Sequence, residues 1–269
     1  MADSMRQIEV VRHDPASARP ELESVVVEEP LEIRIGKVSL VVTMRTPGHD
    51  AELAAGFLLT EGVIGSHSDI EELQHCHDTG SPEGPGNVLV ATLASSAAVD
   101  LERLKRNFLS NSSCGLCGKV SIDQVRHRVK PVVARPVRAS LLFGLSDEMR
   151  VAQTVFSATG GLHAAAIFDA AGGLLCVRED IGRHNAVDKA IGWALLEDRL
   201  PVDGAIMLVS GRASFEIVQK ALGAGIGVVA AISAASTLAR ELALESGMTL
   251  VGFLRDQRLL VYTGVVTNE

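Results

Sequence analysis

The second half of the chain alternates short apolar runs with longer amphipathic stretches, and this rhythm constrains the fold more than any other feature of the sequence. The apolar runs lie at residues 164–168, 174–177, 205–209, 228–232, 249–254 and 259–262. The helical stretches lie near residues 185–196, 214–224 and 236–246. This alternation is typical of a layered α/β domain, for which we expect a largely parallel sheet. Ligands of such sheets bind beyond the carboxyl ends of the strands.

The first half of the chain predicts a smaller α+β unit. Residues 31–35 and 38–44 alternate apolar and polar side chains on either side of Gly36-Lys37, which is typical of a β-hairpin. A helix is expected from Asp50, because an aspartate side chain can cap the free N–H groups of the first turn. Residues 87–93 predict a further strand.

Two interruptions divide the chain. Residues 1–24 show no apolar period, and Pro131 and Pro136 make a helix or central strand improbable over residues 130–136. We therefore expect three parts, namely a flexible arm over residues 1–24, an N-terminal α+β domain over residues 25–138 and a C-terminal α/β domain over residues 139–269.

The composition excludes several classes of protein. Among 269 residues, 25 Lys and Arg stand against 33 Asp and Glu, and a net charge of −8 argues against general nucleic-acid binding. No apolar run approaches the roughly 20 residues of a membrane span, and residues 1–29 lack the apolar core of a secretory signal. Four cysteines at irregular spacing form no disulfide framework, so we expect a cytoplasmic protein with reduced thiols.

Cys114 and Cys117 form a glycine-flanked pair in the stretch Ser-Ser-Cys-Gly-Leu-Cys-Gly-Lys. Its small polar neighbours and the charge of Lys119 favour an exposed loop with a thiolate. Three uses of this spacing stay open, namely half of a zinc site, a dithiol redox couple and a thiolate that carries sulfur. Zinc would need further ligands, for which His75 and His77 are candidates. Cys176, inside an apolar run, is interpreted as a core residue.

Three polar loops follow apolar runs and are expected at one edge of the sheet. They begin at Arg178, Ser210 and Arg255. In the first loop Arg183, His184 and Asn185 offer donors to a phosphate or a heterocycle, although Glu179 or Asp180 could instead neutralise Arg183. The second loop carries Arg212 and a predicted helix cap at Ser214, an arrangement that favours an anion pocket without matching a P-loop.

Residues 158–165 read Ala-Thr-Gly-Gly-Leu-His-Ala-Ala. Thr159 is expected to cap a helix, and His163 is interpreted as a structural hydrogen-bonding residue rather than a catalyst. The stretch is similar to the helix start of zinc-dependent deaminases, but Ala165 stands where their glutamate acts. The deaminase fold is therefore compatible with this sequence, whereas zinc-dependent hydrolysis is not.

Several of these segments together carry a family resemblance. The chain contains Arg45-Thr-Pro-Gly-His-Asp, Ser113-Cys-Gly-x-Cys-Gly, Thr159-Gly-Gly-x-His-Ala-Ala, Arg178-Glu-Asp-Ile-Gly-Arg-His-Asn and Ser210-Gly-Arg-x-Ser-Phe-Glu in this order, followed by Gly252-Phe-Leu-Arg and Val261-Tyr-Thr. In these motifs it resembles the FdhD family, the sulfur carrier proteins required for formate dehydrogenase activity. The resemblance extends over residues 25–264.

The resemblance implies a mechanism and a site. Family members are sulfurtransferases that accept sulfur from a cysteine desulfurase as a persulfide, which here falls on Cys114, with Cys117 as its partner thiol. They pass the sulfur to the molybdenum (or tungsten) bis-guanine-dinucleotide cofactor of formate dehydrogenase. The expected cofactor-binding residues are Phe253, Leu254, Arg255, Asp256, Gln257 and Arg258, and the loops add Arg183, His184 and Arg212 as further candidates.

The resemblance also implies a homodimer and a cytidine-deaminase-like fold for the C-terminal part. This sequence departs from the family at Asp256, where members usually carry glycine. Two other classes of function stay open alongside sulfur transfer. One is a chaperone that only binds the cofactor for formate dehydrogenase, and the other is a dithiol redox or zinc protein.

Overall fold

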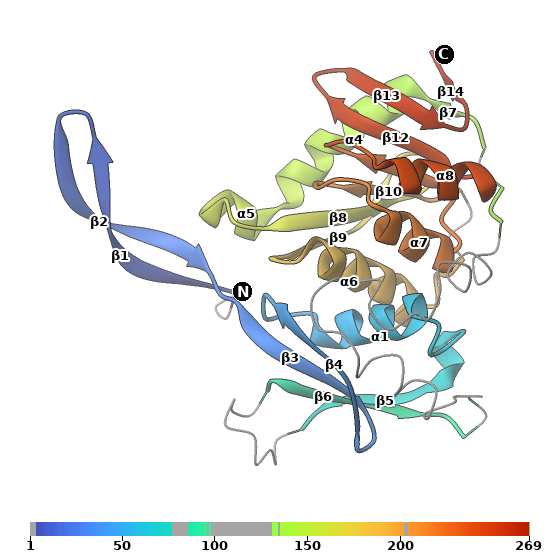
Figure 1. Ribbon diagram of the computed structural model, residues 1–269, viewed down its shortest axis with the longest axis horizontal. Coiled ribbons are helices and arrows are strands. Elements are labelled where there is room, and N and C mark those ends of the chain that lie inside the picture. The colour runs from blue at the N-terminus through green and yellow to red at the C-terminus, as the bar shows by residue number, and fades with distance from the viewer. Residues whose placement is uncertain are drawn as a thin grey trace.

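A six-stranded mixed sheet forms the centre of the C-terminal half (Figure 1). The structure is a computed structural model that describes residues 4–76, 86–95, 97, 131–133, 135–201 and 204–268. The strand order is β13-β12-β11-β10-β8-β9. The strands are β8 (His163–Phe168), β9 (Leu174–Asp180), β10 (Ile206–Val209), β11 (Val228–Ala231), β12 (Thr249–Arg255) and β13 (Arg258–Thr263). The predicted α/β class and all six expected strands are confirmed.

The prediction of a largely parallel sheet is wrong. Only the pairs β10–β11 and β11–β12 are parallel, whereas β8–β9, β8–β10 and β12–β13 are antiparallel. The connections give the physical reason. A helix lies between the strands of each parallel pair, but β8–β9 and β12–β13 are joined by short turns, which can only reverse the chain.

Helices cover both faces of this sheet. One face carries α6 (Arg183–Leu196), α7 (Phe215–Gly223) and α8 (Thr237–Glu245), which the sequence predicted. The other face is covered by α4 (Ala139–Ala152), which buries Leu142, Leu145 and Met149. Successive strand residues alternate between the two sides, as Ile206 and Leu208 face α4 while Met207 and Val209 face the other helices.

Two α-helices of the C-terminal half were not expected from the sequence. The first is α4, and the second is α5 (Thr154–Thr159), which follows it directly. The prediction that Thr159 begins a helix is wrong, because this residue ends α5 and its hydroxyl donates to the carbonyl oxygen of Val155. The next residue, Gly160, has a φ of 66° and forms the C-cap of α5.

The N-terminal unit is a four-stranded sheet with one helix packed on it. The sheet order is β4-β3-β6-β5, and the predicted hairpin is its β3–β4 pair. The elements are β3 (Glu29–Ile35), β4 (Val38–Arg45), α1 (Asp50–Thr60), the short helix η1 (His67–Asp69), β5 (Ile70–His75) and β6 (Val88–Leu93). A small pair, β7 (Val137–Arg138) with β14 (Val266–Thr267), ties the segment before α4 to the C-terminal segment.

The two units meet where α1 packs on α6, so that residues of both contribute to one hydrophobic core (Figure 1). Two glycines set the distance between these helices. A Cβ atom added at Gly192 would lie 1.8 Å from the carbonyl oxygen of Glu52, and one added at Gly56 would lie 1.9 Å from that of Asp188. The helix backbones are therefore in direct contact, and no side chain fits between them.

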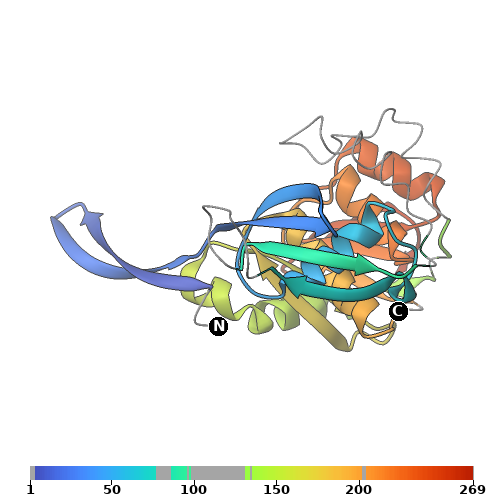
Figure 2. The same cartoon turned by 90° about the horizontal axis from the view of Figure 1, so that it is seen from below.

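The N-terminal arm is a long two-stranded hairpin that extends away from the rest of the molecule (Figures 1 and 2). Its strands are β1 (Met5–Asp14) and β2 (Ser17–Val26), which pair along their whole length. The sequence of residues 1–24 has no apolar period, so it gave no sign of these regular strands. The reason is that most of these side chains are exposed, so neither strand has a buried face that would impose a period of two.

The contact between α1 and α6 predicts that Gly192→Ala lowers the free energy of unfolding by about 1–3 kcal/mol or more, because the added methyl group must separate the two helices. Gly144→Ala is the matched control. Gly144 is also helical, but an added Cβ atom there meets nothing within 4 Å, so we expect a gain of about 0.5–1 kcal/mol. Urea denaturation measures both. Equal stability of the two variants would contradict the close contact.

Candidate functional site

A cavity of about 650 Å³ opens at the edge of the central sheet where the parallel strands have their carboxyl ends. The three polar loops identified in the sequence each contribute a lining residue, namely Ile181, Ser210 and Arg255. His163, the first residue of β8, lies at the same edge because β8 runs antiparallel to β10. The opposite wall is formed by residues of α4 and α5 together with the segment that follows them.

The β12–β13 hairpin brings the expected cofactor-binding stretch to this cavity. Arg255 pairs with Arg258, which leaves Asp256 and Gln257 as a two-residue turn with φ values of 52° and 54°. Positive φ at both central residues is typical of a type I′ turn, which favours Asn, Asp and Gly. This preference gives a backbone reason for the glycine that the family resemblance implies at position 256.

Only part of the expected cofactor-binding stretch 253–258 lines the cavity. Leu254, Arg255 and Asp256 line it, whereas Phe253, Gln257 and Arg258 do not. Phe253 has a φ of 51°, an unusual backbone conformation for a bulky side chain, and its N–H donates to the carbonyl oxygen of Ser233. It lies at an irregularity of the β12–β13 pairing, between Gly252 and Arg255.

Arg183 lies next to the cavity, and its charge acts on the carboxylate of Glu216 only from beyond ion-pairing distance. Its Nε atom is buried and has no hydrogen-bond partner, and no carboxylate of the described residues forms an ion pair with it. Arg183 and His163 both approach Gly211, where an added Cβ atom would lie 3.8 Å and 3.6 Å from their nearest atoms. Burial lowers the pKa of His163, and the positive charges of Arg183 and His184 lower it further.

Glu179 and Asp180 do not neutralise Arg183, because each carboxylate binds another group. Glu179 accepts hydrogen bonds from the N–H groups of Val155 and Phe156 and thereby caps α5. Asp180 is fully buried, and its carboxylate lies 2.7 Å from the Nζ atom of Lys189. The alternative of an ion-paired Arg183 therefore finds no support among the described residues.

Other residues of the stretch 178–185 form polar contacts that bind the C-terminal unit to the N-terminal unit. Arg178 forms a two-pronged ion pair with Glu52 of α1, and Asp180 accepts from the N–H of Thr46. The side chain of Asn185 donates to the carbonyl oxygen of Met44. Sequence reasoning missed these structural roles, because most of the partners lie more than 120 residues earlier in the chain and no local pattern marks them.

The remaining candidates, His184 and Arg212 of the loops that begin at Arg178 and Ser210, do not line the cavity. His184 approaches Glu216 with 2.6 Å between Nε2 and Oε2, and this contact lowers the pKa of Glu216. Arg212 is exposed. The prediction that Ser214 caps α7 is wrong for its side chain. Ser214 is the N-cap residue, but its hydroxyl makes no capping hydrogen bond.

The cysteines divide into two groups. Cys176 is buried in β9, as expected of a core residue, and burial raises its pKa to about 12, so its thiol is neutral at physiological pH. Cys114 and Cys117 lie outside the described residues, as does His77. Within the described parts of the chain, no cluster of three or more His, Cys, Asp and Glu side chains is arranged to hold a metal ion.

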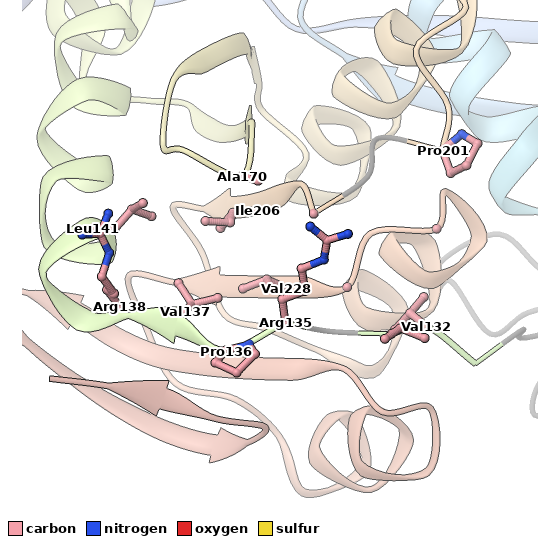
Figure 3. Close-up of a pocket in the computed structure, with 14 residues that line it drawn as sticks. Val132, Arg135, Pro136, Val137, Arg138, Leu141, Ala170, Pro201, Ile206 and Val228 are labelled. Atoms are coloured by element: carbon pink, nitrogen blue, oxygen red, sulfur yellow. The ribbon is translucent and has the colours of Figure 1, made fainter. Parts of the chain in front are cut away.

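A second cavity, of about 510 Å³, opens at the opposite edge of the sheet (Figure 3). Ile206 and Val228, the first residues of β10 and β11, contribute to its lining. Apolar side chains and glycine backbone make up most of the remaining wall, together with Arg135 and Arg138. None of the expected site residues lines it, so the cavity at the carboxyl edge is the candidate functional site.

Fold and site define a class of protein, namely a mixed α/β protein with a cavity of polar and apolar residues at the carboxyl edge of its sheet. Beside it lies an arginine whose buried Nε atom has no hydrogen-bond partner among the described residues. A family model described as the FdhD/NarQ family matches residues 26–267, and the chain belongs to this family. The resemblance found in the motifs is thereby confirmed. Among the described residues, no helix has both the length and the apolar character needed to cross a membrane.

Relatives named sulfur carrier protein FdhD match nearly the whole chain. The protein from Mycolicibacterium paratuberculosis is 52% identical over 97% of this chain and 96% of its own. The protein from Streptomyces coelicolor is 48% identical over 96% and 93%. A crystal structure described as a formate dehydrogenase accessory protein from Desulfotalea psychrophila matches with a TM-score of 0.76 at 23% identity and covers 97% of both chains. This last likeness concerns the fold alone.

Proposed function

We propose that this chain is a sulfur carrier for formate dehydrogenase. It accepts sulfur from a cysteine desulfurase as a persulfide on Cys114 and transfers it to the molybdenum (or tungsten) bis-guanine-dinucleotide cofactor, which is its substrate. The names of its relatives support the carrier role. The observation that carries the cofactor assignment is the buried Nε atom of Arg183, which has no hydrogen-bond partner among the described residues and lies beside the cavity.

The first half-reaction is thiol–disulfide chemistry. The Cys114 thiolate attacks the outer sulfur of the desulfurase persulfide, a new S–S bond forms, and the desulfurase cysteine leaves as a thiolate. Once the cofactor is bound, Cys117 serves as the resolving thiol. Its attack on the Cys114 sulfur forms a Cys114–Cys117 disulfide and releases hydrosulfide, which becomes the sulfur ligand of the metal. An external dithiol must reduce this disulfide before the next cycle.

The cavity offers what a nucleotide part of the cofactor needs. Its volume of about 650 Å³ lies within the range of roughly 300–1,000 Å³ found for small-molecule sites. The guanidinium groups of Arg255 and Arg183 suit phosphate oxygens. A buried donor without a partner is uncommon, and an anionic ligand would satisfy the one on Arg183.

The alternative functions differ in what they require of the cysteines. A chaperone that only holds the cofactor needs no thiol at position 114, whereas a zinc or redox protein would bind metal or form a reversible disulfide without taking up sulfur. The cytoplasmic location stays a prediction that rests on the irregular cysteine spacing, and the homodimer stays one that rests on the family resemblance.

Persulfide loading tests sulfur transfer. After incubation with a cysteine desulfurase and cysteine, we expect one additional sulfur on Cys114, visible by mass spectrometry and removed by a thiol reductant. Cys114→Ala should lose this sulfur and fail to support formate dehydrogenase in cells that lack the native carrier. Cys176→Ala is the control and should load normally, because the buried thiol is unreactive. An active Cys114→Ala variant would favour the chaperone.

The unpaired arginine predicts the affinity for a fragment of the cofactor. Arg183→Gln should weaken the binding of GDP by about tenfold or more, since a hydrogen bond to a charged group contributes roughly 1.5–3 kcal/mol. Arg240→Gln is the control, because Arg240 is exposed on α8 away from the cavity lining. Isothermal titration calorimetry measures both. GDP binding that is unchanged in Arg183→Gln would contradict the assignment.

The position of Asp256 at the cavity yields a prediction about the affinity for GDP. Removing its charge should strengthen GDP binding by about two- to fivefold, because a carboxylate at the cavity repels phosphate across a distance that solvent partly screens. Asp256→Asn removes the charge alone, whereas Asp256→Gly also relieves the positive φ. Both variants should therefore bind GDP more tightly, but only glycine should in addition stabilise the fold. Unchanged binding in both would show that Asp256 lies away from the phosphates.

A further inference from the structure

The wall of the carboxyl-edge cavity that lies opposite the strand ends carries a second set of ligand-binding groups. This wall is built from α4 and α5, which follow each other directly along one side of the central sheet (Figure 1). Asp147 lines the cavity from α4, Gln153 from the C-cap of α4, and Phe156 from α5. None of them belongs to the stretch 253–258 or to the polar loops. We call these three residues the helical wall.

Gln153 is buried without a hydrogen-bond partner for its side-chain amide among the described residues. The residue is only 3% exposed. Its hydrogen bonds to described residues are made by its backbone, whose N–H donates to the carbonyl oxygen of Met149 and whose carbonyl oxygen accepts from the N–H and the hydroxyl of Ser157. An amide that is buried without hydrogen bonds costs free energy. Because Gln153 lines the cavity, a ligand there can supply the missing hydrogen bonds.

Asp147 adds a carboxylate to a cavity whose arginines suit an anion. This exposed carboxylate forms no ion pair or hydrogen bond with a described residue. An ionised carboxylate only accepts hydrogen bonds, so the ligand group that faces it must be a donor. Guanine carries two adjacent donors on its Watson–Crick edge, N1–H and the 2-amino group, whereas adenine has an acceptor beside its single donor group. Asp147 therefore matches guanine.

Phe156 and Arg150 together offer a flat surface to a base. The guanidinium of Arg150, which also lines the cavity, lies 4.7 Å from the centroid of the Phe156 ring. It also donates to the hydroxyl of Ser157 over 2.8 Å, which holds it over the ring. Aromatic rings and guanidinium planes are common stacking partners of nucleobases in proteins. Stacking and hydrogen-bonding groups thus lie on the same wall.

The cavity therefore has two chemically different walls. The strand-end wall carries His163, Ser210 and Arg255, which suit phosphate oxygens. The helical wall carries an amide, a carboxylate and an aromatic ring, which suit a base. The six residues from Asp147 to Gln153 correspond to a rise of about 9 Å along a helix, a span that suits a purine lying along this wall.

We propose that the helical wall binds the guanine base of the cofactor and determines the specificity for guanine. Asp147 accepts hydrogen bonds from N1–H and the 2-amino group, the amide of Gln153 donates to O6, and the ring of Phe156 stacks on the base. This inference rests on the proposed function, because it takes the nucleotide part of the cofactor as the ligand. It assigns the choice of base to residues that lie apart from the phosphate-binding arginines.

Two nucleotides that differ in one amino group test the role of Asp147. Inosine diphosphate lacks the 2-amino group of GDP, so the wild-type protein should bind it about tenfold more weakly, by isothermal titration calorimetry. Asp147→Ala should weaken GDP binding by about tenfold or more and should bind both nucleotides equally within about twofold. A carboxylate that only repels phosphate gives the opposite result, since its removal would strengthen the binding of both nucleotides alike.

Glu148→Ala is the matched control for Asp147→Ala. Glu148 is the next residue of α4, is likewise exposed and does not line the cavity. Its removal deletes the same charge from the same helix, so GDP should keep its preference over inosine diphosphate. Circular dichroism verifies that both variants are folded.

Gln153→Leu separates a binding role from a structural one. The variant should weaken GDP binding by about two- to tenfold, because one hydrogen bond to the base is lost. Its stability in urea should stay unchanged or rise, since the wild-type amide has no partner among the described residues and leucine has a similar size. A loss of stability with unchanged GDP binding would show that Gln153 supports the fold and not the base.

The proposal is overturned if the wild-type protein binds ADP or inosine diphosphate as tightly as GDP, or if Asp147→Ala keeps the preference for GDP. A protein that binds no GDP would overturn it as well. Sulfur loading on Cys114 and the effect of Arg183→Gln on GDP binding report on the proposed function separately. A chain that loads sulfur and needs Arg183 for GDP, but is unaffected by Asp147→Ala, refutes the base contact alone.

Discussion

The backbone contact between α1 and α6 is the constraint on which the rest of the structure depends. Because Gly56 and Gly192 allow the helices to touch, three polar interactions between the units come within reach. Arg178 meets Glu52, Asp180 meets the backbone of Thr46, and the Asp188 carboxylate accepts a hydrogen bond of 2.8 Å from Thr60. A wider spacing would leave these groups buried without partners, which is costly. The glycines thus make the charged motif compatible with burial.

The same constraint decides which charges remain available for a ligand. Lys220 is buried against Asp188, and burial raises the pKa of Asp188 while the ammonium group opposes the shift. Lys189 likewise forms a buried ion pair with Asp180. Each buried cation of α6 and α7 therefore has its carboxylate. Arg183 at the start of α6 forms no ion pair within the described residues, and its charge acts on Glu216 only from a longer distance, which distinguishes it from the structural network beside it.

Local patterns predict what is local, and this explains the outcome of the sequence analysis. Strand and helix positions in the C-terminal half follow from the apolar rhythm, and the position of the cavity follows from the order of strands and loops. The relative direction of the strands was predicted wrongly, because an apolar run does not indicate whether its strand is parallel or antiparallel to its neighbours. The short turns after β8 and β12, which force reversal, were the usable signal. The contact of Gly56 with Gly192 had no such signal, since it joins residues more than 130 positions apart.

The turn at Asp256 shows how backbone geometry and ligand chemistry compete at one position. A type I′ turn admits Gly, Asn or Asp, and only Asp adds a negative charge. That charge lies beside Arg255, so it reduces the potential that this exposed guanidinium presents to a phosphate. Arg183 is less affected, because its donor atom is buried and meets no carboxylate of the described residues. Under the proposed function, anion recognition therefore depends more on the start of α6 than on the β12–β13 turn.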